Sequence, residues 1–154
     1  MITLDYILRG SPHPGSDLEE IDESAIHYDL FLGDIIFRVD ELDMSTSWGW
    51  IPIIDFAVCL DRIANGLVPR QAQSFEFTES EHRIDFTLRD GTVQIRTTYA
   101  AREARASLEE FRHGTREFLR RVLDDLTMRY STLAQNKYIR RIYPKAAVPG
   151  LGRA

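Results

Sequence analysis

The 154-residue sequence contains one cysteine, Cys59, and no long hydrophobic run. A single thiol excludes an internal disulfide and any zinc site built from several cysteines. No apolar segment approaches the roughly 18 residues that a membrane-spanning helix requires. Residues 1–5 do not combine a basic stretch with an apolar one, so we predict no secretory signal. We therefore expect a cytoplasmic protein that does not bind membranes.

The sequence also lacks the common catalytic motifs. It has no glycine-rich phosphate loop, no Gly-x-Ser-x-Gly, no paired histidines on a helix and no calcium loop. Nothing near Cys59 supplies the base or the positive charge that a catalytic thiol needs. We assign no catalytic, cofactor-binding or metal-ligating residue, and these absences argue against an enzyme. A site assembled from distant residues stays open at this point.

Glycine and proline are scarce, with 9 and 6 residues, whereas 44% of the residues are hydrophobic and 28% are charged. This composition excludes collagen-like, low-complexity and wholly disordered chains. A chain of this length is the usual size of one domain with one ordinary core. We therefore expect a single α+β domain over residues 1–154, with a mobile loop at 11–24 and a frayed tail at 145–154.

Alternation of apolar and polar residues predicts strands in both halves of the chain. The first three cover residues 1–9, 25–32 and 34–42, with a tight turn at Gly33 between the last two. A meander of three shorter strands follows between residues 75 and 99. Its last two strands are joined by Asp90 and Gly91, which predict a type I′ hairpin turn.

Helical spacing of apolar residues predicts two main helices. The first opens at Pro52 and ends at Gly66, and the second starts at Ser107, with Glu110 three residues later as in a capping box. Residues 136–143 extend the second helix or form a short third one. The order βββ-α-βββ-α predicts a mostly antiparallel sheet of about six strands with two helices packed on one face. Whether the strands form one sheet or two stays open.

The net charge of −5 is distributed unevenly along the chain. Residues 1–66 carry 13 acidic and 3 basic residues, and residues 67–154 carry 11 acidic and 16 basic ones. A negative surface of this kind steers a basic partner, whereas a nucleic-acid binder needs a basic surface. Pairing between the two halves and a solvated loop are the simpler explanations. The densest acidic residues are Asp17, Glu19, Glu20, Asp22, Glu23, Asp40, Glu41 and Asp43.

Two tryptophans, Trp48 and Trp50, flank Gly49 in the connector before the first helix. They have three interpretations: a plug at the end of the core, an aromatic anchor at a protein interface, or a slot for a small ligand. Because Asp55 follows closely, the ligand interpretation predicts a pocket near Trp48, Trp50 and Asp55.

The layout of the chain resembles a group of small bacterial α+β domains of unknown function. The resemblance lies in the order of the strands, in the helix start Ile-Pro-Ile-Ile-Asp-Phe-Ala at residues 51–57, in the Phe-Glu-Phe strand at 75–77 and in the long terminal helix. Some proteins of this build are immunity proteins, which bind secreted toxins in the cytosol. The resemblance implies a binding protein, and it transfers no functional residue.

These observations favour a non-enzymatic cytoplasmic domain that binds a protein partner with a basic surface. The resemblance points to an immunity protein that neutralises a basic toxin such as a nuclease. The predicted contact surface combines the eight acidic residues with Trp48 and Trp50. Two alternatives stay open: a small-ligand-binding protein or enzyme with a pocket near Asp55, and a structural or oligomerisation module.

Overall fold

A computed structural model describes residues 1–100 and 103–144 of the chain, and the predicted tail at 145–154 lies outside the described residues. The elements, in order, are β1 (Ile2–Gly10), η1 (Ala25–Asp29), β2 (Leu32–Val39), β3 (Leu42–Asp43), β4 (Ile51–Pro52), α1 (Ile53–Gly66), β5 (Gln73–Glu76), β6 (Arg83–Arg89), β7 (Thr92–Thr97), β8 (Glu103–Ser107), α2 (Leu108–Arg129), η2 (Ser131–Gln135) and α3 (Lys137–Ile142).

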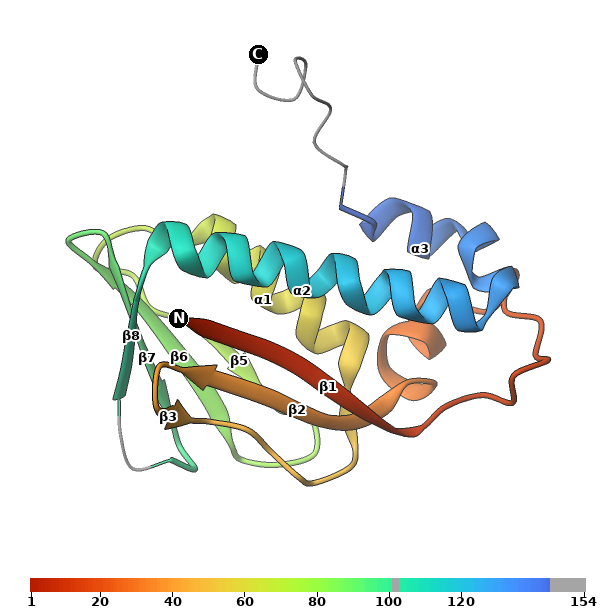
Figure 1. The fold of residues 1–154 in the computed structure, drawn as a ribbon, viewed down its shortest axis with the longest axis horizontal. Coiled ribbons are helices and arrows are strands. Elements are labelled where there is room, and N and C mark those ends of the chain that lie inside the picture. The colour runs from red at the N-terminus through yellow and green to blue at the C-terminus, as the bar shows by residue number, and fades with distance from the viewer. Residues whose placement is uncertain (101–102, 145–154) are drawn as a thin grey trace, which may run out of the picture.

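The strands form two antiparallel four-stranded sheets (Figure 1), whereas the sequence predicted about six strands and left open whether they form one sheet or two. The N-terminal sheet contains β1, β2, β3 and β4, and the C-terminal sheet has the order β5-β6-β7-β8. The α+β class is confirmed. The strand number differs for three reasons: the predicted strand at residues 25–32 does not form, the two-residue strands β3 and β4 are too short to show alternation, and β8, a run of alternating charged residues and alanines, carries too weak an apolar pattern.

The predicted strand at residues 25–32 is wrong, and so is the tight turn at Gly33. Residues Ala25–Asp29 form one helical turn, since the buried Ile26 and Phe31 and the half-buried Leu30 between them are spaced as on a helix. Gly33 lies inside β2 and not in a turn. An added Cβ there would lie 1.9 Å from the carbonyl oxygen of Ile7, so the close approach of β1 is what requires glycine.

The third strand of the N-terminal sheet is interrupted. After β3 the chain stays beside β2, where the Met44 and Thr46 N–H groups donate to the carbonyl oxygens of Phe37 and Ile35. Residues 47–50 then leave the ladder, and the chain rejoins β2 at β4. We call residues 47–50 the bulge.

The C-terminal sheet keeps one face in the core and one in solvent, as its alternation predicts. The type I′ turn is confirmed, since Asp90 and Gly91 have φ angles of 52° and 75°. The solvent face carries ion pairs, including Arg83 with Asp85 at 3.1 Å. These side chains therefore neutralise one another.

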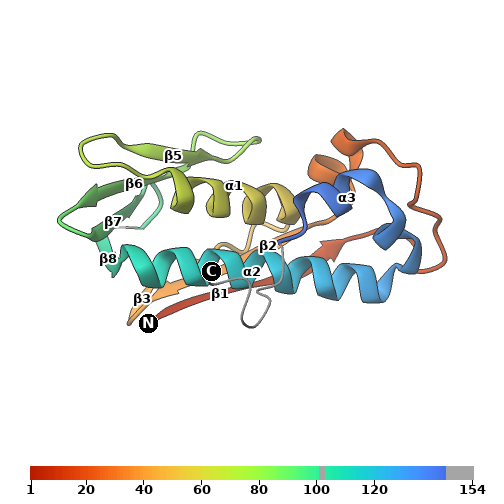
Figure 2. The same cartoon turned by 90° about the horizontal axis from the view of Figure 1, so that it is seen from above.

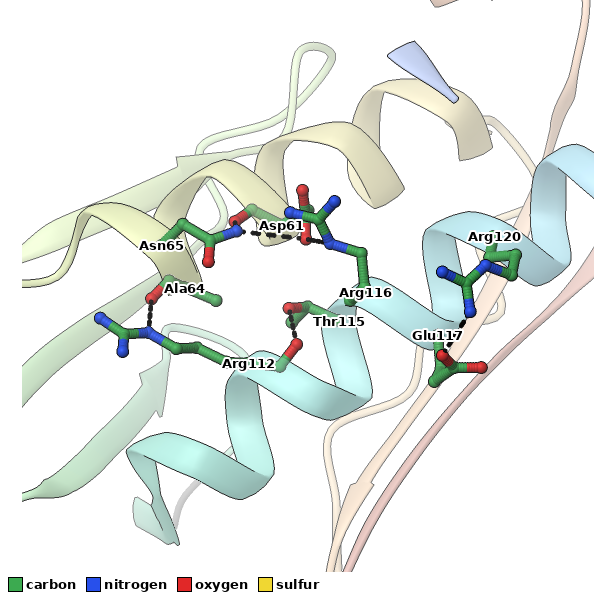
Figure 3. Close-up of polar contacts among 8 residues, drawn as sticks. All are labelled: Asp61, Ala64, Asn65, Arg112, Thr115, Arg116, Glu117 and Arg120. Carbon is green, nitrogen blue, oxygen red and sulfur yellow. Dashed lines mark hydrogen bonds and ion pairs between the residues drawn. The ribbon is translucent and has the colours of Figure 1, made fainter. Parts of the chain in front are cut away.

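The two long helices lie side by side over the sheets (Figure 2). The start of α2 is confirmed, because the Ser107 hydroxyl accepts a hydrogen bond from the Glu110 N–H at 3.0 Å. Polar contacts tie α2 to the end of α1 (Figure 3). Arg112 donates to the carbonyl of Ala64 at 3.1 Å, and Arg116 pairs with Asp61 at 3.1 Å. Arg112 thus satisfies a carbonyl in the last turn of α1.

Phe56 of α1 is fully buried, and it contacts Phe75 of β5 and Phe118 of α2, with ring centroids 5.1 and 6.1 Å apart. These contacts join α1 to the C-terminal sheet and to the second helix. No helix among the described residues is both long enough and apolar enough to cross a bilayer.

Candidate functional site

The segment after β1 presents a group of exposed carboxylates, which we call the acidic loop. Leu18 within it is 3% exposed and points into the core, so its neighbours face outward. Within the described residues only Glu23 of this group forms an ion pair, with Arg141 of α3. The acidic loop consists of Asp17, Glu19, Glu20, Asp22 and Glu23, all of which are exposed.

Asn136 attaches the acidic loop to the body of the protein. Its side-chain nitrogen lies 3.0 to 3.1 Å from the carbonyl oxygens of Leu18, Glu19 and Ile21. Its side-chain oxygen accepts a hydrogen bond from the Tyr138 N–H at 2.9 Å and so caps α3. Asn136 is itself 3% exposed. One buried amide therefore fixes both the loop backbone and the start of the last helix.

Two further side chains hold the same segment. The Leu18 N–H donates to the Thr132 hydroxyl at 2.8 Å, and the Tyr130 hydroxyl donates to the carbonyl of Pro12 at 2.7 Å. The mobility of residues 11–24 stays a prediction. These contacts nevertheless define one conformation in which the carboxylates are displayed.

In the second acidic group, Asp40 and Glu41 form the turn between β2 and β3, and Asp43 is the last residue of β3. All three side chains are exposed, Asp40 pairs with the N-terminal ammonium group, and Asp43 pairs with Arg38 at 3.7 Å. Hydrogen bonds from Ser45 lower the pKa of Asp43. The turn and the acidic loop lie at opposite ends of β2, about 24 Å apart along an eight-residue strand (Figure 1). The structure does not bring the two acidic groups together.

Trp48 and Trp50 stack on each other, with centroids 5.4 Å apart and planes 15° apart. His82 stacks on the other face of Trp48 at 5.1 Å, and Tyr99 meets the Trp48 ring edge-on at 5.2 Å. Both tryptophans are half-buried. The stack joins the bulge to the C-terminal sheet, while Trp50, its outer member, stays partly open to solvent.

The hollow that Asp55 lines has neither tryptophan among its lining residues. Asp55 belongs to a polar cluster formed by η1, α1 and α3, in which its Oδ1 accepts from His27 Nε2 at 2.6 Å and from the Cys59 thiol at 3.3 Å. The other imidazole nitrogen, Nδ1, hydrogen-bonds to the Tyr138 hydroxyl. This cluster is not evident from the sequence, because its members come from three elements. Only the i, i+4 spacing of Asp55 and Cys59 signalled it.

The cluster offers no ready nucleophile. Burial, together with the charge of Asp55, raises the pKa of the Cys59 thiol from 9.0 to about 12. Burial likewise raises the pKa of Tyr138 to about 12. Both imidazole nitrogens of His27 are occupied. The cluster therefore holds three elements together. The Cys59 thiol and the Tyr138 hydroxyl stay protonated near neutral pH.

Two hollows border this cluster, of about 330 and 370 Å³. They share Tyr28 and Arg62 as lining residues, and Asp55 and Cys59 line the larger one. Among the described residues no group of three or more histidine, cysteine or acidic side chains converges as a metal site.

Comparison of the chain with protein-family models, with curated proteins and with solved structures found no match. The function of the protein therefore has to be inferred from the chemistry of the described residues.

Proposed function

We propose that the protein is a non-enzymatic binding domain whose acidic loop receives the basic surface of a protein partner. The observation that carries the proposal is the attachment of the loop to Asn136, Thr132 and Tyr130. Four of its five carboxylates have no ion pair within the described residues, so their charge is available to a partner. A binding surface that is already ordered loses less conformational entropy on association.

Electrostatics support a basic partner over a neutral one. Clustered like charges raise the association rate of an oppositely charged protein and penalise a partner of the same sign. The acidic loop lies at one end of the molecule, beside α3 (Figure 2). Glu19, Glu20 and Glu23 line an open hollow of about 400 Å³ at this end, together with the basic side chains Lys137, Arg140 and Arg141 of α3. An open surface of this kind suits a protein partner.

The partner class that fits best is a basic toxin such as a nuclease, which makes the chain an immunity protein. This finer proposal rests on the resemblance in layout and on the acidic surface. The polar cluster around His27, with no free imidazole nitrogen and a protonated thiol, supports binding rather than catalysis.

The test measures the affinity of the chain, by calorimetry, for the basic proteins encoded beside its gene. The triple variant Glu19→Lys, Glu20→Lys, Asp22→Lys should weaken binding by at least about a hundredfold, since close charge pairs contribute several kcal/mol at protein interfaces. The matched control reverses three exposed charges on another part of the surface: Glu76→Lys, Glu79→Lys and Glu81→Lys. Equal affinities for the two triple variants would overturn the proposal.

A small-ligand site is the second candidate function. The observation that favours it is the hollow of about 370 Å³, which is lined by the buried Asp55 and the half-buried Cys59. A compound that raises the melting temperature of the wild type, and not that of Asp55→Asn, would support this function. Absence of any such compound in a broad metabolite screen would leave the binding-domain proposal as the better one.

A further inference from the structure

The bulge creates a gap in the N-terminal sheet beside Asp34. On one side of the gap the Thr46 N–H donates to the carbonyl of Ile35 at 3.0 Å, and on the other Ile51 pairs with Gly33. Asp34 lies between these two positions on β2, and its side chain points to the face of the sheet away from the core. Interruptions of this kind re-aim side chains and are frequent next to binding sites.

The Asp34 carboxylate is buried and only half satisfied. Its side chain is 5% exposed, and its Oδ2 accepts a hydrogen bond from Arg9 Nε at 3.0 Å. Its Oδ1 is buried and accepts no hydrogen bond from the described residues. An unsatisfied buried acceptor is costly, more so when it carries charge. A hydrogen-bond donor from another molecule would therefore stabilise the Asp34 carboxylate at Oδ1.

Two apolar side chains share the face of the sheet that carries this acceptor. Ile7 lies directly opposite Asp34 on β1 and is 41% exposed, while Ile36 lies two residues further along β2 on the same face. Gly49 of the bulge covers the carboxylate: a Cβ there would lie 4.0 Å from Asp34 Oδ1 and 3.9 Å from Arg9 Cγ. A desolvated charge beside exposed apolar surface is an arrangement found at interface hot spots.

We propose that Asp34 Oδ1 is the anchor point for a lysine or arginine side chain of the basic partner. This inference rests on the proposed function and names the contact that would follow the initial encounter at the acidic loop. An ammonium or guanidinium group can donate a charge-assisted hydrogen bond to Oδ1. Because Arg9 donates to Oδ2, the two cations would bind different oxygens of one carboxylate. A bare metal ion suits the place less well, because one carboxylate beside a guanidinium provides few oxygen ligands.

Arg9 competes with a partner's cation for the Asp34 carboxylate, while Gly49 of the bulge, which covers Oδ1, has to shift for that cation to enter. The Arg9 side chain is 56% exposed and holds Asp34 through a single nitrogen, so it can turn aside when a partner's side chain arrives. Removal of Arg9 should therefore open the carboxylate rather than weaken binding.

The two tryptophans of the chain both lie in the bulge, so tryptophan fluorescence reports on this place alone. Titration of the full chain with hexaarginine and hexalysine peptides should give a saturable change in emission. Asp34→Asn should weaken that response at least about tenfold, the loss expected for one charge-assisted contact. The matched control Asp29→Asn removes an exposed carboxylate on η1 and should leave the response unchanged.

A second variant covers the case in which Asp34→Asn fails to fold. Arg9→Ala should strengthen the response to either peptide by about threefold or more, because a competing cation is removed. If Asp34 is only a structural ion pair whose Oδ1 binds water, Arg9→Ala will lower the melting temperature and leave the peptide response unchanged. That result, or an unchanged response in folded Asp34→Asn, would overturn the proposal.

The outcome separates this inference from the proposed function. Loss of binding in the acidic-loop triple variant with no effect of Asp34→Asn would leave the proposed function standing and remove the anchor. Loss of binding in Asp34→Asn with no effect of the triple variant would support the anchor at Asp34 and reject the acidic loop as the surface that binds the partner.

Discussion

Cys59 shows how a residue with a reactive side chain is kept inert. Its thiol donates to Asp55, which also accepts from His27, and burial raises the thiol pKa to about 12. A thiol with a raised pKa holds its proton through the neutral range, and it becomes a thiolate only as the pH approaches that value. Cys59 therefore acts as a hydrogen-bond donor in a structural cluster.

We expect iodoacetamide to alkylate Cys59 in the folded protein at least about tenfold more slowly than in the urea-unfolded protein at about pH 8, because fewer thiols are ionised. Asp55→Asn removes one cause of the raised pKa and should speed the reaction. Mass spectrometry of timed samples measures both rates. Equal rates in the folded and unfolded wild type would contradict the assignment.

Gly33 is the residue at which the N-terminal sheet tolerates least change. A Cβ at this position would lie 1.9 Å from the Ile7 carbonyl oxygen, so β1 and β2 would have to separate. Gly33→Ala should lower the free energy of unfolding by roughly 2–4 kcal/mol, as measured by urea denaturation. In Gly10→Ala, the matched control on β1, the new Cβ meets Leu32 at an ordinary 3.7 Å. Similar losses in the two variants would show that the close approach is unimportant.

At the scale of elements, the acidic loop and α3 depend on one side chain. Asn136→Ala removes three contacts to the loop and the cap of α3, and it leaves buried carbonyl groups without a donor. We expect a loss of about 1–3 kcal/mol in stability and faster amide hydrogen exchange across residues 16–23. Asn65→Ala, on the exposed surface of α1, serves as the control. Unchanged exchange in Asn136→Ala would show that other contacts hold the loop.

The outer edge of β1 is blocked against pairing with another strand. Arg121 of α2 donates to the Leu4 carbonyl, and the Asp5 carboxylate accepts from the Tyr6 N–H at 2.8 Å. Side chains that occupy edge groups in this way oppose strand addition. Arg121→Ala should therefore increase self-association in analytical ultracentrifugation, whereas Arg89→Ala should not. Stable dimers of the wild type through this edge would favour the oligomerisation module instead.

The sequence predicted those elements whose signals are local. The Asp90-Gly91 turn and the Ser107 cap each depend on residues within a few positions, and both are confirmed. The sequence did not predict η1 or β8. Each is only five residues long and mixes polar with apolar side chains, and so short a pattern does not distinguish a strand from a helical turn. The polar cluster of His27, Asp55 and Tyr138 depends on contacts between distant segments, which no local pattern encodes.

At the scale of the whole molecule, the charge asymmetry has two parts. Some of it is internal, as in the pairs Arg116–Asp61 and Arg141–Glu23. Most of the rest lies at the two ends of β2, in the acidic loop at one end and at residues 40–43 at the other. Asp40 and Asp43 are paired with positive groups, whereas most of the acidic loop is not. The acidic loop is thus the better candidate for an external partner.

The central claim is that a basic protein partner binds at the acidic loop and the bulge. Amide hydrogen exchange of the free chain and of its complex with that partner tests the claim most directly. We predict increased protection at residues 16–24 and 47–50, with residues 40–43 unchanged. Protection confined to residues 40–43, or to the outer face of the C-terminal sheet, would contradict the account.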